Sequence, residues 1–590
     1  MKKKPIFFGI AGMLAVLVAS SCSEDFLDLK PIAKDTEETF YSTFEAVDFT
    51  VTAAYSRLHI LNYDVSAVLV SQAAGDDMEV GGDNAADGAD WKLIDQLIHT
   101  PGNATLNAFW DSNYKGIRHA NTALVYLPRF EETHLELVKQ RTAESKFMRA
   151  FYHFKLLEMY GGVPIIDRVL SPADFKLGRN SIAEVLHFIQ KDLVEAIPDL
   201  KTRSQLGSNE IGRASKGAAQ SLLAKAYLYE SSYAKYHAGD DRFAGCEEKF
   251  NLALLEAESV ISSNEYKLVG IDGERFPSWW SKVANPVPGD TTVGAFRWIF
   301  SVDGDNSQET VFESQNAMDG RGWAQSTGNG LVIFTTNRYT DLTGTWIGWG
   351  FNVASKYLLD AFRNEDGRET DLSAENKEVI NQYADPRFGT TIGMEGDLMV
   401  VRNSAGEYAA DGRLDTSPMR LSNVPTGTAC RKWEVHPDEF YLSPLKVANE
   451  AGPINWKLIR YADVVLMAAE AALESGNSPR ALELVNMVRT RARNSNNDPN
   501  TANHIYPKNL SSLTFGDIMH ERRLEFALET SRFNDLVRWN KTAEFINGIE
   551  LALTPGYTIS FDPAKHFFLP IPVMEIQLSE GNLKQYPGWN

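Results

Sequence analysis

The sequence predicts a mainly α-helical protein in which stacked helices flank a long, loop-rich insert. Apolar residues recur at helical spacing from about residue 40 to residue 266, which is the pattern of amphipathic helices packed on one another. Between residues 270 and 451 this pattern stops, and Gly, Pro, Asn and Asp become frequent. Helical spacing returns at residue 458. These observations favour helix-on-helix packing, with the irregular chain concentrated in one segment.

Three helices are well marked in the first half of the chain. Residues 143–160 carry apolar side chains at steps of three or four, and Gly161-Gly162 ends this helix. A second helix is predicted for residues 214–233, where small residues along one side allow close packing. A third helix is predicted for residues 250–261. The first half is therefore expected to be a stack of helices.

Two further helices are predicted after the insert, over residues 458–473 and 481–493. In the turn between them, Ser478 is the expected N-cap and Pro479 the first helical residue. A tight pair of antiparallel helices with Ala at the close contacts is typical of one tetratricopeptide unit.

The insert and the C-terminal region carry other local patterns. Short apolar runs at residues 296–300 and 331–334 predict strands. A long helix is predicted for residues 517–539, whose many charged residues indicate a salt-bridged helix face rather than a catalytic cluster. The pairs expected at i,i+3 spacing are Arg522 with Glu525, Glu529 with Arg532, and Asp535 with Arg538. Residues 567–572 contain two prolines and are predicted to lie extended against the body.

The composition is that of a folded, acidic protein. The chain has 590 residues, of which 43% are hydrophobic and 23% charged, as in ordinary globular proteins. Its net charge of −20 repels phosphate backbones, so a nucleic acid partner is not expected. Beyond the N-terminal segment the only cysteines are Cys246 and Cys430, so the fold does not depend on a disulfide framework.

The N-terminus has the order of segments found in a secretory signal. Lysines at residues 2–4 precede an apolar stretch over residues 6–19 and two serines, and Cys22 follows directly. A Cys in this place is similar to that of a bacterial lipobox, whose thiol takes a diacylglycerol. We therefore predict a signal peptide over residues 1–21 and a lipid on Cys22. Ser23-Glu24-Asp25 resembles the acidic tag of surface-exposed bacterial lipoproteins, which implies an outer-membrane, surface-exposed location. The alternative is a plain secreted protein.

Signatures of catalytic and metal chemistry are missing from the sequence. It has no His-Glu-x-x-His, Cys-x-x-Cys or Gly-x-Ser-x-Gly motif. Residues 207–213 space their glycines like a Walker loop, but Arg213-Ala214 stands where Lys and a hydroxyl residue are needed. Residues 303–307 alternate oxygen ligands, but they lack the Gly and Glu of a calcium loop. The acid pair Asp76-Asp77 is interpreted as a polar loop. We expect no catalytic residue, metal or cofactor.

Tryptophan is concentrated in the insert. Half of the 12 Trp lie between residues 279 and 349, namely Trp279, Trp280, Trp298, Trp323, Trp346 and Trp349. Flanking glycines around the last three favour indoles that are presented to a ligand. The apolar face of a pyranose stacks on a flat indole, while nearby polar groups bond its hydroxyls. The alternative interpretation is that these side chains hold long loops in place.

Six blocks, in order along the chain, resemble the SusD/RagB family of outer-membrane nutrient-binding lipoproteins. They are FLDLKP at 26–31, AESKFMRAFYHFKLLEMYGGVPII at 143–166, GRASKGAAQSLLAKAYLYE at 212–230, IRYADVVLMAAEAALESGN at 459–477, HERRLEFALETSRFNDLVRWNK at 520–541 and FFLPIPVMEIQLSEGNLKQYPGW at 567–589.

This resemblance implies a scaffold of about four tetratricopeptide-like helix pairs and a less regular, ligand-facing part. It implies no bond-breaking activity. It also implies a partner, a TonB-dependent SusC-like transporter that receives the captured oligosaccharide. The regions expected are a signal peptide at 1–21, a helical region at 22–269, an insert with ligand-binding loops at 270–451, and a helical region at 452–590.

The resemblance also implies that a Trp-containing segment after the first helices, here residues 76–91, lines the binding site. We expect sugar to stack on Trp91, Trp323, Trp346 and Trp349, with hydroxyl partners Asp77, Arg321 and Asn329. The alternatives are the same scaffold binding a peptide or another nutrient, a glycoside hydrolase, and a scaffold with no small ligand. Trp enrichment in the insert favours a sugar.

Overall fold

A computed structural model describes most of the chain, and it divides into two compact units. The described residues are 37–59, 63–281, 290–317, 327–336, 339–340, 346–363, 385–401, 415–419, 421, 424, 426–435 and 452–589. The units are Met1–Phe49 and Thr50–Asn590. The predicted signal peptide and Cys22 lie outside the described residues. None of the described helices is long and apolar enough to cross a bilayer.

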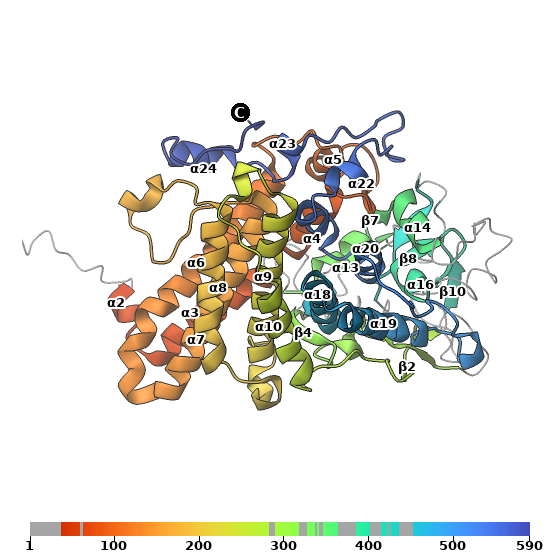
Figure 1. Cartoon of the computed structure of the whole chain (residues 1–590), viewed down its shortest axis with the longest axis horizontal. Coiled ribbons are helices and arrows are strands. Elements are labelled where there is room, and N and C mark those ends of the chain that lie inside the picture. Colours follow the sequence, from red (N-terminus) through yellow and green to blue (C-terminus); the bar gives the residue numbers. More distant parts are fainter. Residues whose placement is uncertain are drawn as a thin grey trace, which may run out of the picture. The chain divides into compact units, whose positions relative to one another are not determined.

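The first unit contains α2 (Glu37–Phe40) and the beginning of α3 (Phe44–Ser56), which continues into the second unit. The helices that follow in the second unit are α4 (Tyr63–Ala73), α5 (Ala89–Asp95), α6 (Ala104–Tyr126), α7 (Glu131–Tyr160), α8 (Ile182–Ala196), α9 (Lys216–Tyr236) and α10 (Phe250–Ser262). From α6 to α10 each helix packs against the next (Figure 1). The predicted mainly helical class is therefore confirmed.

Local sequence explains where these helices begin and end. Asn103 caps α6, because its side chain accepts hydrogen bonds from the backbone N–H groups of the first turn. Ser181 and Glu184 form a reciprocal capping box at α8. At the end of α7, Gly161 has φ 69°, which a residue with a side chain adopts only with strain. The predicted stop at Gly161 is confirmed.

The tetratricopeptide-like pair predicted after the insert is α18 (Tyr461–Glu474) and α19 (Ser478–Asn494). Its α18 packs against α10, so the stack of helices continues across the insert (Figure 1). The N-cap of α19 is Asn477 rather than the predicted Ser478, and the Asn477 side chain accepts from Arg480 N. Asn is as favourable an N-cap as Ser, and here the Asn477 side chain is the one that reaches the first turn.

Between α10 and α18 the chain forms small two-stranded antiparallel sheets and short helices. The strands are β1 (Met78–Gly81), β2 (Arg275–Pro277), β3 (Thr292–Gly294), β4 (Thr310–Ser314), β5 (Tyr339–Thr340), β6 (Trp346–Ile347), β7 (Phe351–Ala354), β8 (Ile392–Met394), β9 (Leu398–Val401), β10 (Asp415–Pro418), β11 (Thr428–Cys430) and β12 (Trp456–Arg460). Each pairs with one other: β1 with β7, β2 with β3, β4 with β12, β5 with β6, β8 with β11, and β9 with β10. Apart from β1, all of them belong to the irregular part of the chain.

Two predicted strands are wrong. The runs at 296–300 and 331–334 lie largely in the short helices α12 (Ala295–Trp298) and α13 (Gly330–Thr335). A short, fully buried apolar run has no exposed face, so its periodicity does not separate a strand from a helical turn. The other short helices of the irregular part are α14 (Lys356–Arg363) and α16 (Arg387–Thr391).

The long helix predicted for residues 517–539 is two helices, α20 (Phe515–Glu525) and α21 (Arg532–Arg538). Leu528 has φ 59° in the turn between them. The chain ends with α22 (Thr542–Ile546), α23 (Pro563–His566) and α24 (Val573–Leu578). Residues 567–572 run without helix, and Leu569 N donates to Met159 O at 2.8 Å, so the predicted extended tail lies against α7.

Candidate functional site

Four aromatic side chains meet where the irregular part contacts the N-terminal helices. This aromatic cluster consists of Trp91, Phe334, Trp349 and Phe351. The Trp91 ring meets the Phe334 and Phe351 rings edge-on, with centroids 5.6 and 5.2 Å apart, and Trp349 lies 4.4 Å from Phe334. Both phenylalanines are buried, whereas both indoles are half-buried. The phenylalanines therefore support two indoles that remain partly open to solvent.

Three elements distant in sequence position the cluster. Trp91 lies on α5, Phe334 on α13 and Phe351 on β7. Strand β7 pairs with β1, which leads into α5. The backbone of Trp349 is held by α13, because its N–H donates to Ile333 O at 2.9 Å.

Glycine is required beside these rings. Gly82 and Gly88 have φ of 83° and 65°. A Cβ atom on Gly88 would lie 2.8 Å from the Trp91 ring and 2.9 Å from the Phe351 ring, closer than real contacts allow. Only glycine lets the loop between β1 and α5 pass over the cluster.

Two buried carboxyl groups fix α5 to its surroundings. Asp95, one turn after Trp91, accepts a hydrogen bond from Val80 N at 3.1 Å. Burial raises the pKa of Asp95 well above its ordinary value, and nearby Glu79 raises it further. Glu79 accepts from Ala552 N and Leu553 N at 2.9 and 2.7 Å. Strand β1 and helix α5 are thus fastened to each other and to the C-terminal region.

A polar loop borders the aromatic cluster. Asp83 N donates to the Asp87 carboxylate at 2.9 Å, and Lys92 Nζ donates to Asn84 O at 2.5 Å. Asp83 and Asn84 are exposed, and Asp87 and Lys92 are half-buried. Carboxylate, amide and ammonium groups are the partners that sugar hydroxyls use. The site combines apolar ring faces with a polar edge.

The structure brings two predicted stacking residues together and leaves the others untested. Trp91 and Trp349 both contact Phe334 in the aromatic cluster. Trp346 is placed by its backbone in β6, opposite Thr340 of β5. Arg321 and Trp323 lie outside the described residues. The sequence analysis did not predict Phe334 and Phe351 as site residues. The glycines at 81, 82 and 88 were the available signal, because they allow the backbone to pass close to the Phe351 segment.

Asp77 does not reach the surface as the prediction requires. It is 1% exposed, and its carboxylate accepts from Arg523 Nε at 2.6 Å. Neighbouring Asp76 pairs with both Arg523 and Arg532. Burial raises the pKa of Asp77 against the pull of Arg523, while at Asp76 the two guanidinium groups outweigh burial and lower the pKa. In this structure Asp77 fastens the start of β1 to α20 rather than binding hydroxyls.

Asn329 also has a structural role in place of the predicted one. It is fully buried, and its side-chain oxygen accepts from Leu331 N at 2.9 Å, which caps α13. Its side-chain nitrogen donates to Ile454 O at 3.0 Å. An Asn whose groups are engaged in this way holds Phe334 in place through α13. By contrast, the side chains of residues 83–87 beside the aromatic cluster are exposed or half-buried.

Other tryptophans of the insert hold loops together. Trp280 is 1% exposed, and the guanidinium groups of Arg297 and Arg431 lie 4.1 and 4.2 Å from its ring. Trp298 stacks on Phe276 at 4.2 Å. For these two side chains the alternative interpretation, loop packing, describes the structure.

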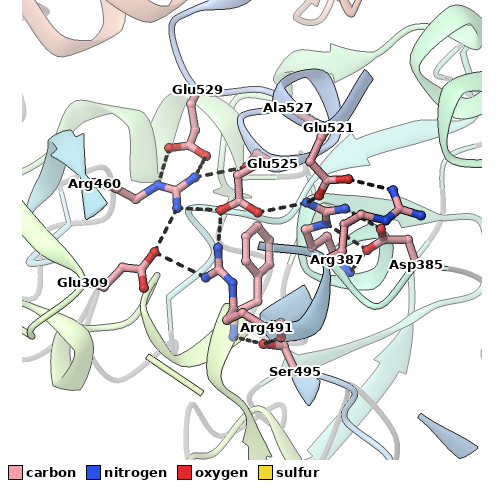
Figure 2. A network of polar contacts seen from close by, with 12 residues as sticks. Glu309, Asp385, Arg387, Arg460, Arg491, Ser495, Glu521, Glu525, Ala527 and Glu529 are labelled. Carbon is pink, nitrogen blue, oxygen red and sulfur yellow. Dashed lines mark hydrogen bonds and ion pairs between the residues drawn. The ribbon is translucent and has the colours of Figure 1, made fainter. Parts of the chain in front are cut away.

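The charged residues of the C-terminal region form a buried network, not an exposed helix face. Figure 2 shows Glu525 among the guanidinium groups of Arg387, Arg460 and Arg491. Glu525 and all three arginines are 2% exposed or less as side chains. Burial alone raises the pKa of Glu525, but the three guanidinium groups outweigh it and hold the pKa at about 2.

The network joins distant elements. Arg460 of β12 contacts Glu529 at 2.8 Å, and Arg387 of α16 contacts Glu521 of α20 at 2.7 Å (Figure 2). Of the predicted local pairs, Asp535 with Arg538 is confirmed at 2.8 Å. The other two predicted pairs are wrong, because all four side chains turn inward to other partners. The contacts observed are Arg522 with Asp463 and Asp535, Glu525 with Arg387, Arg460 and Arg491, Glu529 with Lys432 and Arg460, and Arg532 with Asp76. The network fastens the irregular part to the helices.

Among the described residues, no group of three or more His, Cys, Asp and Glu side chains is arranged to hold a metal ion. In the segment noted for its alternating oxygen ligands, Asp305 is engaged by Lys457 Nζ at 2.5 Å. Residues 207–213 form a turn before α9, as predicted.

A stack of helices with small two-stranded sheets in its irregular part defines a mainly α-helical protein. Two family models match the chain: "SusD family" over residues 308–589 and "Starch-binding associating with outer membrane" over residues 25–228. The chain belongs to the SusD/RagB family.

Relatives and solved structures agree with this assignment. A SusD-like protein from Bacteroides ovatus is 25% identical over 89% of this chain and 80% of its own length. The starch-binding protein SusD from Bacteroides thetaiotaomicron is 24% identical over 78% of this chain and 74% of its own length. A laminarin-binding SusD-like protein is similar in structure, with TM-score 0.65 and 25% identity over 92% of this chain and 99% of that one. Surface glycan-binding protein A from Bacteroides thetaiotaomicron, in complex with laminarihexaose, has TM-score 0.67 and 21% identity over 92% and 100% of the two chains.

Proposed function

We propose that this chain is a cell-surface glycan-binding lipoprotein that captures oligosaccharide or polysaccharide and delivers it to a TonB-dependent, SusC-like outer-membrane transporter. The observation that carries the proposal is the aromatic cluster, in which half-buried Trp91 and Trp349 rest on buried phenylalanines beside a polar loop. The names of its relatives, which include starch-binding and laminarin-binding proteins, support a glycan as the ligand.

The geometry suits stacking on sugar. An indole that is packed from behind keeps its orientation when a pyranose lies on its exposed face, so little conformational entropy is lost on binding. Two indoles that both pack on Phe334 provide more than one stacking surface. Trp346 in β6, together with Trp323 and Arg321, completes the proposed site.

Capture without bond cleavage is the proposed activity. The charged residues that resemble a catalytic cluster in the sequence are buried in ion pairs, where no polysaccharide reaches them. A glycoside hydrolase requires two carboxyl groups on opposite sides of an accessible sugar. The purified protein is therefore expected to bind polysaccharide and release no reducing sugar from it.

The anchor and the transporter partner belong to the same proposal. A lipid on Cys22 would hold the protein at the outer membrane, because a net charge of −20 opposes electrostatic binding to anionic lipid. Metabolic labelling with a palmitate analogue tests this: the wild-type chain is expected to be labelled, and Cys22→Ser is not. Co-purification of a transporter barrel with the tagged chain tests the partner.

Affinity electrophoresis in gels that contain laminarin, starch, xylan, mannan, pectin or arabinan tests glycan binding. At least one polysaccharide is expected to retard the wild-type chain, and Trp91→Ala is expected to migrate faster in that gel. Trp298→Ala is the matched control, since Trp298 packs on Phe276 away from the aromatic cluster. If no polysaccharide retards the wild-type chain, or if both variants migrate like it, the proposed function is wrong.

A further inference from the structure

A cavity of about 240 Å³ lies between the turn before α9 and strand β4. Gly212 and Arg213 line one side, and Asn306 lines the other. The cavity therefore joins the two segments whose glycine and oxygen spacing stood out in the sequence, residues 207–213 and 303–307. The proposed function uses neither segment. None of the residues that line this cavity belongs to the aromatic cluster.

Arg203 provides a positive charge in the wall of the cavity. It is half-buried, and its Nη2 donates to the backbone oxygen of Asn306 at 2.7 Å. Among the residues that the structure describes, no carboxylate lies within ion-pair distance of Arg203. Arg213, in the same wall, instead donates to Glu144 at 2.7 Å. A guanidinium group that has only a carbonyl as partner retains donors for an incoming carboxylate.

The rest of the lining is suited to hydroxyl groups. The hydroxyls of Ser215 and Tyr266 lie 2.8 Å apart and bond each other. Glu313 is 3% exposed, and its carboxylate is already engaged by Lys457 at 2.8 Å and by the backbone N–H of Asn306 at 2.6 Å, so the two hydroxyls are the polar groups left for a ligand. Phe312 and Leu206 supply apolar surface. The lining combines one cationic end, a neutral polar wall and an apolar patch.

The volume limits the ligand to one small ring. Since a water molecule occupies about 30 Å³ in the liquid, the cavity has room for about eight waters. Sites for drug-sized ligands begin at roughly 300 Å³. Ile211, which lines the cavity, is 53% exposed, so the cavity is accessible from solvent and can admit the terminal ring of a longer chain.

We propose that this cavity is a second binding site, specific for a hexuronic acid, with the carboxylate on Arg203 and the ring hydroxyls toward Tyr266 and Ser215. Phe312 packs against the ring. The ligand is either a free hexuronic acid or the terminal unit of an acidic oligosaccharide, because both present the same group. This site does not depend on the proposed function of the aromatic cluster.

Isothermal titration of the full-length chain with galacturonic acid, glucuronic acid, glucose and acetate tests the proposal. At least one hexuronic acid is expected to bind, at least 10-fold more tightly than glucose or acetate. Arg203→Gln is expected to weaken this binding about 10- to 100-fold, since hydrogen bonds to charged groups contribute that much. Arg118→Gln is the matched control, because Arg118 is exposed on α6 and does not line the cavity.

A second variant keeps the test valid if Arg203→Gln unfolds. Leu206→Trp narrows the cavity from its edge and is expected to abolish hexuronic acid binding while the melting temperature stays unchanged. Trigalacturonic acid distinguishes the two sources: binding of both compounds at this site indicates a terminal sugar unit, and binding of the monomer alone indicates a free acid. Trp91→Ala is expected to leave hexuronic acid binding unchanged, so failure here is separable from failure of the aromatic site. The proposal is overturned if neither hexuronic acid binds, if glucose binds equally well, or if Arg203→Gln has no effect.

Discussion

Replacement of Glu525 by Gln tests whether the buried network stabilises the chain. Glu525 accepts from Arg387 at 3.0 Å and from Arg460 at 2.8 Å, and it also contacts Arg491. The variant keeps the shape of the side chain but leaves three buried guanidinium groups with one fewer negative partner.

The expected cost follows from the pKa. Burial raises the pKa of Glu525, but Arg491, Arg460 and Arg387 outweigh it, so the pKa in the folded chain is about 2 against an ordinary value of 4.5. This difference corresponds to about 3 kcal/mol of stability at pH 7. Because the folded-state pKa is depressed, the contribution is fully present above pH 4.5 and is lost as the pH falls toward 2.

Urea denaturation of the wild type and Glu525→Gln between pH 7 and pH 3.5 measures this effect. The difference in the free energy of unfolding is expected to be about 3 kcal/mol at pH 7 and to shrink below pH 4.5. Glu248→Gln is the matched control, since Glu248 is exposed, and it is expected to change stability by less than about 0.5 kcal/mol. A cost below about 1 kcal/mol at pH 7, or one that does not change with pH, would refute the reasoning.

Three other predictions concern the aromatic site. Trp346→Ala and Trp323→Ala should each weaken glycan binding by about 1–3 kcal/mol with a nearly unchanged melting curve, and normal binding by both would remove these residues from the site. Gly88→Ala should lower both the free energy of unfolding and the glycan affinity, because a φ of 65° strains alanine and the ring of Trp91 occupies the place of its Cβ atom. Calorimetry of unfolding and of binding measures both effects. Gly102→Ala is the control, since only the Thr100 hydroxyl lies near that position. Asp95→Asn should keep the hydrogen bond from the backbone N–H of Val80. Relative to the wild type, its free energy of unfolding should rise as the pH increases above about 4, because burial raises the pKa of Asp95 and makes its charged form costly in the folded chain. Equal unfolding free energies of Asp95→Asn and wild type at pH 7 would contradict the last prediction.

Much of the helical scaffold could be predicted from the sequence because its signals are local. The end of α7 at Gly161 and the pair α18–α19 depend on residues within a few positions of the boundary. The charged residues at 522–538 show the limit of such reasoning. Their spacing indicates surface pairs, yet Arg460 and Asp76, which lie far away in sequence, determine where Glu529 and Arg532 point. No local pattern carries information about a partner more than fifty residues away.

The candidate site was only partly predictable for a similar reason. The family resemblance pointed to Trp91, and the concentration of tryptophan in the insert pointed to Trp349, because a flat indole suits a sugar ring. Phe334 and Phe351 were missed, since a buried Phe that supports a site is indistinguishable in sequence from any core Phe. Asp77 and Asn329 have the right chemistry for hydroxyls, but Arg523 and the first turn of α13 engage them. Availability of a polar group is a property of the packed structure.

A crystal structure of the chain with an oligosaccharide fragment of whichever polysaccharide retards it in the gel assay tests the central claim most directly. A sugar ring is expected to lie parallel to the indole of Trp91 or Trp349, at a stacking distance of about 4 Å, with hydroxyls bonded to residues 83–87. A sugar bound elsewhere, with both indoles uncovered, would contradict the account.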